Sequence, residues 1–158
     1  MLASTDGWIT CALGHRHWGR VGAAGLLLHR DGVHGPELLL QHRAEWSHHG
    51  GTWGTPGGAL HEGESPDAGA LREVQEELGL HPDDVVLGAC SVDDHGGWSY
   101  TTVLARPARR IEAADLILDG ESTGVAWLPL TSLDGLDLHP GLAGSLSRLR
   151  PLLDDARR

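Results

Sequence analysis

Three glutamates between positions 73 and 77 have a spacing that suits metal chemistry. Glu73, Glu76 and Glu77 stand three and four residues apart, so a helix would carry their carboxylates on one face. Like charges at this spacing repel each other, and the negative end of the helix dipole disfavours them further. Carboxylate oxygens are preferred ligands of Mg²⁺ and Mn²⁺. The pattern therefore indicates a divalent-cation site, with a solvated acidic face as the alternative interpretation.

The neighbouring residues predict the elements that would position these carboxylates. A serine followed by proline at the start, and a glycine after the end, predict a helix from Ser65 to Leu78. In the preceding loop, the glycines of TPGG (55–58) allow the backbone to approach a ligand closely. Arg72 offers a bidentate fork for one more carboxylate, for which Glu64 is the obvious candidate.

Residues 58–80 read GALHEGESPDAGALREVQEELGL. This segment resembles the signature of the Nudix hydrolases: Gly, five residues, Glu, seven residues, then Arg-Glu-apolar-x-Glu-Glu-x-Gly-apolar. The matching positions are Gly58, Glu64, Arg72, Glu73, Val74, Glu76, Glu77, Gly79 and Leu80. The resemblance implies a Nudix-type α/β/α sandwich with a mixed central sheet, extending from about Val21 to Leu153.

The resemblance also implies an activity. Nudix hydrolases are metal-dependent pyrophosphohydrolases, which cleave a nucleoside diphosphate linked to another moiety, or a nucleoside triphosphate, by water attack at phosphorus. The metal ligands implied for Mg²⁺ or Mn²⁺ are Gly58 (through its carbonyl), Glu73, Glu76 and Glu77. Glu64 and Arg72 would form an ion pair that fixes the loop against the helix. The implied partner is a small nucleotide.

Two carboxylates are candidates for the general base. Glu77 is expected to contribute to catalysis as a metal ligand. Glu73 is one candidate. Glu121, before Trp127, is the other, because MutT-like members have a Glu or Asp near this place. The alternative for Glu121 is a turn residue after Asp119 and Gly120.

Three further residues are candidates for substrate binding. Arg43 ends an expected strand beside the glycine-rich loop and could contact phosphates, with a solubility role as the alternative. Trp98 and Tyr100 could stack on a nucleobase. The alternative is that tryptophan fills the core, because the chain has no phenylalanine. The tyrosine and proline that mark diadenosine polyphosphate and ADP-ribose members are absent, so the residues do not assign a subfamily.

The composition excludes several classes of partner. The 158 residues contain 12 basic and 22 acidic side chains, with a formal net charge of -10. This balance disfavours a nucleic-acid polymer or an anionic membrane as partner. Residues 1–10 have no basic start or apolar core, so we expect no signal peptide and a cytoplasmic protein. Every basic residue is arginine, which excludes lysine Schiff-base chemistry.

Cysteine and histidine offer a second kind of metal chemistry, which the sequence makes a poor candidate. Two cysteines cannot build a disulfide framework. His15 and His17, or the neighbouring His48 and His49, could bind a transition metal. Neither pair has a companion cysteine in a familiar zinc pattern, so solvated histidines are the expectation.

The rest of the chain predicts alternating strands and helices. Strands are expected over 21–30, 38–43, 84–92, 98–106 and 124–130, and a second helix over 141–153. Residues 1–20 are expected to be an irregular N-terminal extension, residues 44–58 a loop, and residues 21–158 a single domain. A non-catalytic nucleotide sensor of the same fold is the main alternative function, an isoprenoid diphosphate isomerase a remote one. A homodimer is an open alternative to a monomer.

Overall fold

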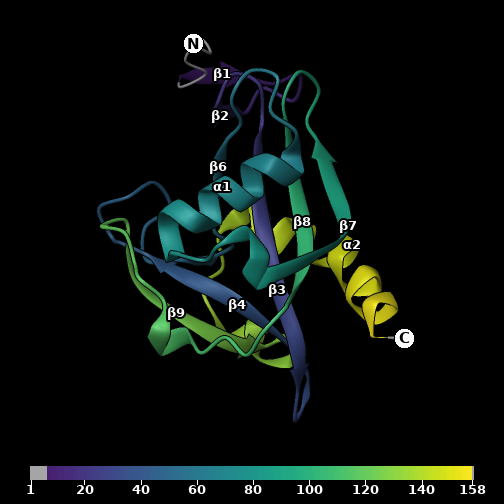
Figure 1. Cartoon of the computed structure of the whole chain (residues 1–158). Helices are drawn as coiled ribbons and strands as arrows, with labels where there is room; N and C mark the ends of the chain where they lie inside the picture. The colour runs from purple at the N-terminus through teal and green to yellow at the C-terminus, as the bar shows by residue number, and fades with distance from the viewer. Residues whose placement is uncertain (1–6, 158) are drawn as a thin grey trace.

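Two helices lie on opposite faces of a mixed β-sheet (Figure 1). This arrangement comes from a computed structural model, which describes residues 7–157. The helices are α1 (Pro66–Leu78) and α2 (Pro140–Ala156). Because the helices cover both faces of the sheet, the predicted α/β/α sandwich is confirmed. Neither helix within residues 7–157 is long and apolar enough to cross a membrane.

The strands are β1 (Trp8–Thr10), β2 (Arg16–Trp18), β3 (Ala23–Gly32), β4 (Gly35–Arg43), β5 (Trp53–Gly54), β6 (Gly57–Ala59), β7 (Val85–Asp94), β8 (Ser99–Pro107) and β9 (Ser122–Pro129). Short 3₁₀ turns occupy η1 (Pro82–Asp84), η2 (Ala113–Asp115) and η3 (Leu130–Gly135). The main sheet has seven strands, with β5-β4-β3-β8-β7 in order, β6 paired to β3 and β9 paired to β4. The β3–β8 pair is parallel and the other pairs are antiparallel, so the sheet is mixed.

Strand β3 is apolar on both faces because both faces are covered. Leu26 and Leu28 pack in the same buried cluster as Val74 of α1. Leu27 points to the other face and packs in a cluster with Leu149 of α2. Alternation along a strand sends neighbouring side chains to opposite faces, so one apolar run serves two cores.

The ends of α1 follow the residues that the sequence marks. The hydroxyl of Ser65 accepts a hydrogen bond from the amide of Ala68, and Pro66 occupies the first turn. Gly79 closes the helix in the left-handed region, at φ 73°, where glycine pays no steric penalty. These two caps set where the glutamates of the helix fall.

Two expectations about irregular segments are wrong. Residues 8–18 form the antiparallel hairpin β1–β2, and residues 44–58 contain the short strand β5 and the first two residues of β6. Each of these strands is only two or three residues long, so hydrophobic periodicity has too few positions to reveal it. The division into an extension (1–20) and a domain (21–158) stays a prediction.

Candidate active site

The candidate site lies where α1 meets the loop before it and the segment before β9. Glu77 is buried, with an exposed fraction of 8%. Its Oε2 accepts a hydrogen bond of 2.8 Å from the amide of Gly57, at the start of β6. Its backbone carbonyl accepts a hydrogen bond of 3.1 Å from the amide of Asp119. These contacts bury Glu77, although it lies on the acidic face of the helix.

Three carboxylates converge at this place. Glu77, Asp119 and Glu121 each offer an oxygen, and these atoms lie within 4.8 Å of one another. Burial, together with the negative charges of Glu73 and Asp119, raises the pKa of Glu77 to about 8. A carboxylate held this way needs a proton or a cation as partner. The donor set is all oxygen and strongly anionic, which fits Mg²⁺ or Mn²⁺.

Asp119 is a site residue that the sequence reasoning missed. It was considered only as part of the turn before Glu121. The Oδ1 of Asp119 accepts a hydrogen bond of 3.1 Å from the backbone amide of Glu121, so the turn itself orients the Asp119 side chain. The carbonyl of Glu121 in turn accepts from the amide of Ala44, after β4. The sequence signal for Asp119 is the pair of acidic residues on either side of Gly120, in Asp119-Gly120-Glu121.

Glu73 lies against the glycine loop. A Cβ atom added to Gly58 would fall 2.6 Å from Oε1 of Glu73, so any other residue here would force this carboxylate to move. Arg72 donates through Nη1 to Oε1 of Glu73 at 2.8 Å. Burial nevertheless raises the pKa of Glu73. The loop at Gly58 and helix α1 therefore meet at the Glu73 carboxylate, which Arg72 holds in place.

Arg72 and Glu64 form the ion pair between loop and helix. Nε and Nη2 of Arg72 donate to Oε2 and Oε1 of Glu64, at 3.0 and 2.9 Å. Nη2 also donates to the carbonyl of Ala59, at 3.0 Å. The guanidinium lowers the pKa of Glu64 to about 2. The fork geometry fixes the loop on α1, which a single point charge could not do as well.

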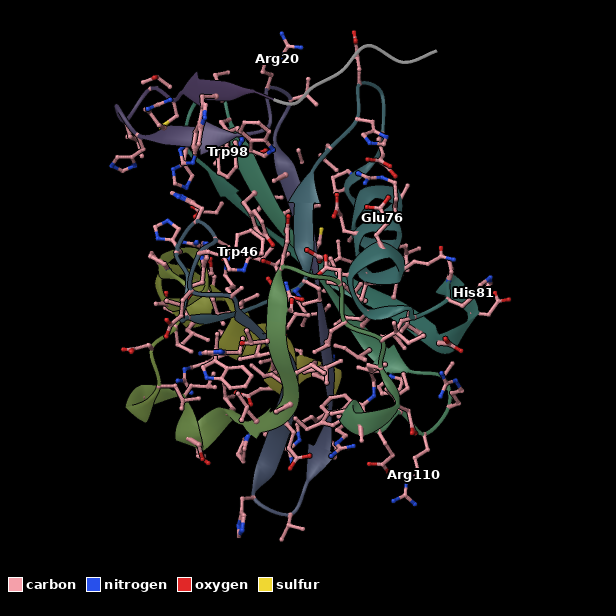
Figure 2. The ribbon with its side chains drawn as sticks, turned by 90° about the vertical axis from the view of Figure 1, so that its left-hand side faces the viewer. Arg20, Trp46, Glu76, His81, Trp98 and Arg110 are labelled. Carbon is pink, nitrogen blue, oxygen red and sulfur yellow. The ribbon has the colours of Figure 1, made fainter. Side chains whose placement is uncertain are left out.

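Two carboxylates near Glu77 in the chain or in space are accessible, Glu76 of α1 and Glu121 of the converging group. The side chain of Glu76 is 61% exposed and lies 3.6 Å from Nη1 of Arg72 (Figure 2). Glu121 is also exposed. Accessible carboxylates beside the buried Glu77 leave room for an anionic substrate to share a cation with the protein.

The residues predicted to bind substrate fall in two places. Tyr100 of β8 lies beside the carboxylates: its hydroxyl is 3.2 Å from Oγ1 of Thr55, and burial raises its pKa to about 12. Arg43 lies near enough to Tyr100 to influence that pKa, and its Nε donates to the carbonyl of His48. Trp98 lies near the N-terminal hairpin (Figure 2). Its ring stacks on the ring of His17, with the two ring centroids 3.8 Å apart. The side chain of Trp98 therefore already has one face covered.

Comparisons with known proteins agree with this geometry. The family model described as NUDIX domain matches residues 19–149. A Mycobacterium tuberculosis protein named "Putative 8-oxo-dGTP diphosphatase 3" is 45% identical over 153 residues, which cover 92% of this chain and 69% of that protein.

A second relative is much longer than this chain. A Bifidobacterium longum protein, named as a fusion of a nucleoside triphosphate pyrophosphatase and a Nudix hydrolase, is 43% identical over 155 residues. The match covers 95% of this chain and 32% of that protein, so the chain spans about a third of its length.

Among solved structures, a Nudix hydrolase from M. smegmatis, RenU, superposes with a TM-score of 0.85 at 39% identity. The superposition covers 95% of this chain and 96% of that one. The similarity therefore includes both helices and the sheet that frame the carboxylates.

Proposed function

Because this chain belongs to the Nudix hydrolase family, we propose that it is a Mg²⁺- or Mn²⁺-dependent pyrophosphohydrolase of small nucleotides. The observation that carries the proposal is the buried Glu77 with Asp119 and Glu121 around it. The substrate is a nucleoside triphosphate or a nucleoside diphosphate linked to another group. An oxidised guanine nucleotide is the first candidate, supported by the name of the M. tuberculosis relative.

The residues present fit a divalent cation. Oxygens of Glu73, Glu76 and Glu77, with the Gly58 carbonyl, are proposed to hold it, and Asp119 extends this set. A bound cation would neutralise phosphate charge and lower the pKa of a coordinated water. The protein itself has a formal net charge of -10, so an anionic substrate is repelled unless a cation lies between them.

The chain supplies positioning and proton transfer. Arg72 orients Glu73 and keeps the glycine loop in place through its four hydrogen bonds to loop and helix. A carboxylate oxygen of Glu121 is proposed to accept the proton of the attacking water, since this side chain is exposed beside the cluster. Glu73 is the alternative base, but Arg72 already occupies its Oε1.

Two residues near the carboxylates, Arg43 and Tyr100, are proposed to contact the substrate. Arg43 would contact phosphate oxygens, and Tyr100 would contact the nucleoside, with Trp98 more remote because it stacks on His17. If Arg43 binds phosphate, Arg43→Ala should raise KM more than it lowers kcat. A fall in kcat alone would instead place this residue in the chemical step.

The activity is tested with a panel of nucleotides and chromatographic product analysis in Mg²⁺. The panel holds the deoxynucleoside triphosphates, 8-oxo-dGTP, 8-oxo-dGDP, ADP-ribose, NADH, diadenosine polyphosphates and nucleotide sugars. We expect selective turnover that is lost on chelation and in Glu77→Gln. Glu62→Gln is the matched control, because Glu62 is exposed in the loop before α1. Full activity of Glu77→Gln would refute the metal assignment, and tight nucleotide binding without turnover would indicate the sensor.

A further inference from the structure

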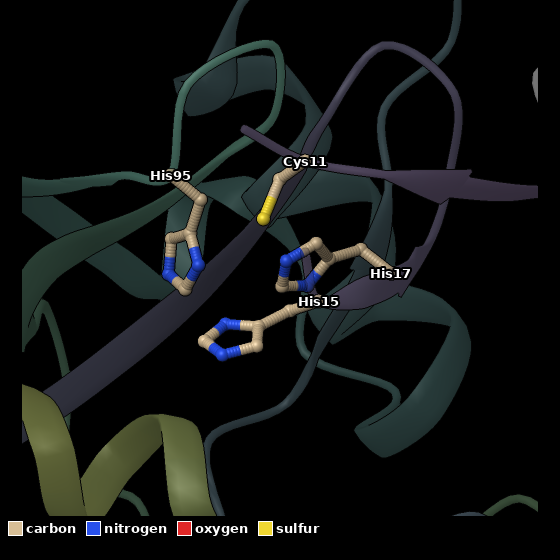
Figure 3. A group of neighbouring side chains, drawn as sticks. All are labelled: Cys11, His15, His17 and His95. Carbon is tan, nitrogen blue, oxygen red and sulfur yellow. The ribbon is translucent and has the colours of Figure 1, made fainter. Parts of the chain in front are cut away.

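A second group of metal-binding side chains lies at the N-terminal hairpin. Cys11, His15 and His17 come from β2 and the turn before it, and His95 follows β7 (Figure 3). Each offers one ligand atom, and the four atoms lie within 4.8 Å of one another. Ligands of a tetrahedral Zn²⁺, at roughly 2.1–2.3 Å from the ion, lie about 3.5 Å apart. Small side-chain rotations would therefore complete a tetrahedron.

Two ring nitrogens in this group lack a hydrogen-bond partner within the described residues. They are Nε2 of His17 and Nδ1 of His95, and both atoms are buried. A buried polar atom without a hydrogen-bond partner destabilises the folded state. A metal ion at the centre of the group would supply the missing partner for both nitrogens.

The other nitrogen of His95 is already oriented by a carboxylate. Nε2 of His95 lies 2.9 Å from Oδ2 of Asp93, and Oδ1 of Asp93 lies 3.4 Å from Arg148 of α2. Metal-binding histidines commonly donate their second nitrogen to a carboxylate, which fixes the tautomer and the ring orientation. Asp93 thus leaves Nδ1 of His95 as the acceptor that points into the group.

The backbone holds the two contributing segments together. The amide of Cys11 donates to the carbonyl of His15 at 2.9 Å, which closes the turn that carries both ligands. The amide of Ala12 donates to the carbonyl of Gly96 at 2.8 Å, which ties this turn to the one after β7. A Cβ atom on Gly96 would fall 2.6 Å from that of Ala12, so the two turns are in close contact. The four ligands are therefore assembled in advance.

We propose that Cys11, His15, His17 and His95 bind one Zn²⁺ as a structural site. Sulfur and imidazole nitrogen are the ligands that Zn²⁺ prefers, whereas Mg²⁺ and Mn²⁺ prefer the oxygens of the carboxylate site. Four protein ligands leave no open position for a substrate, which is typical of a structural ion. The thiolate would offset one of the two charges of the ion, and the Asp93 carboxylate, which also faces Arg148, would offset part of the other. The sequence expectation that His15 and His17 have no companion cysteine is wrong, because folding brings Cys11 beside them.

The ion would fasten the β1–β2 hairpin to the edge of the main sheet. His17 stacks on Trp98, and Nε1 of Trp98 donates to the carbonyl of Gly19 at 3.0 Å. Both strands of this hairpin are only three residues long. Loss of the ion should therefore free the hairpin and lower the thermal stability of the chain.

The test measures metal content and spectrum on the full chain without an affinity tag. After chelation, one equivalent of Zn²⁺ is added, the protein is desalted, and bound zinc is counted by mass spectrometry. We expect close to one zinc per chain, and with Co²⁺ the visible bands of a tetrahedral ion together with a thiolate-to-cobalt band. Cys11→Ser should lose the thiolate band and the retained zinc. Asp93→Asn should weaken zinc binding by about 10- to 100-fold.

Matched variants separate this site from ordinary zinc adhesion. Cys90→Ser removes the other, exposed cysteine and should keep the zinc and the spectrum. His15→Ala should weaken binding, whereas His34→Ala, also an exposed histidine, should not. His15→Ala is a mild change at the surface, so it tests the site even if Cys11→Ser fails to fold. Glu77→Gln should retain zinc, since it lies in the carboxylate site. Equal zinc in the wild type, Cys11→Ser and His15→Ala would overturn the proposal.

Discussion

Replacing Glu77 by glutamine should make the metal-free protein more stable at alkaline pH. The pKa of Glu77 is raised from its ordinary value of 4.5 to about 8, first by burial and then by Glu73 and Asp119. Between these two values the folded state holds a proton that the unfolded chain releases, so stability falls as pH rises. Glutamine carries no charge, has nearly the same shape, and its carbonyl can still accept from the amide of Gly57.

The magnitude follows from the two pKa values. Where Glu77 is ionised in both the folded and the unfolded state, the pKa shift lowers the free energy of unfolding by about 5 kcal/mol, at 1.36 kcal/mol per pKa unit. By the same linkage the cost is about 1 kcal/mol at pH 5 and about 4–5 kcal/mol at pH 8.5. Charge relief in Glu77→Gln should thus raise the unfolding free energy far more at pH 8.5 than at pH 5. Bound Mg²⁺ should reverse the order, because it stabilises the wild type by mass action and the variant much less.

The assay is urea unfolding of the wild type and Glu77→Gln with a chelator at pH 5 and pH 8.5, repeated in Mg²⁺ at pH 8.5. Glu62→Gln, at an exposed position of the loop, is the control and should follow the wild type throughout. A variant less stable than the wild type in chelator at pH 8.5, or a difference that does not change with pH, would refute the reasoning. The first result would mean that Glu77 stabilises the fold as an ion even without metal.

Two further substitutions test the support around Glu73, and a third tests an exposed glycine of α2 as a comparison. Gly58→Ala should lower kcat by about a hundredfold, because its Cβ would displace the Glu73 carboxylate by contact at 2.6 Å; steady-state kinetics measure it. Gly144→Ala, exposed in α2 with open space at its Cβ, should instead raise the unfolding free energy by about 0.5–1 kcal/mol in urea and leave kcat unchanged. Arg72→Lys should cost about 1.5–3 kcal/mol in the same urea assay, since lysine cannot bridge Glu64 and Glu73 with a fork; an equal stability would contradict this role.

Local signals predicted the long elements of the fold well. The helix from Ser65 to Leu78 has a capping serine, a proline in the first turn and a closing glycine, and α1 spans Pro66–Leu78. The apolar run over 21–30 predicted a strand, and the structure shows that β3 is buried on both faces. The sequence did not predict the strands β1, β2, β5 and β6, because pairing with other strands, rather than any periodic pattern, determines them.

The candidate sites show the same limit. Glu73, Glu76 and Glu77 share a helix, so their spacing alone places them on one face of it. Asp119 joins Glu77 through the bond from its backbone amide to the carbonyl of Glu77, a contact across many residues. His95 joins Cys11 in the same way, through the bond between Ala12 and Gly96. Sequence spacing can reveal ligands within one element, whereas ligands from separate loops need the fold.

The two candidate metal sites use different chemistry at the two ends of one short segment. His95 and Trp98 face the sulfur–nitrogen group, and Tyr100, two residues further along β8, lies beside the carboxylates. The ring centroids of Trp98 and Tyr100 are 6.4 Å apart, so the two aromatic side chains are near neighbours. A zinc that fixes His17 against Trp98 would therefore also restrict Tyr100, the side chain proposed to contact the nucleoside. The ligand types keep the ions apart, because oxygen ligands suit Mg²⁺ and sulfur with imidazole suits Zn²⁺.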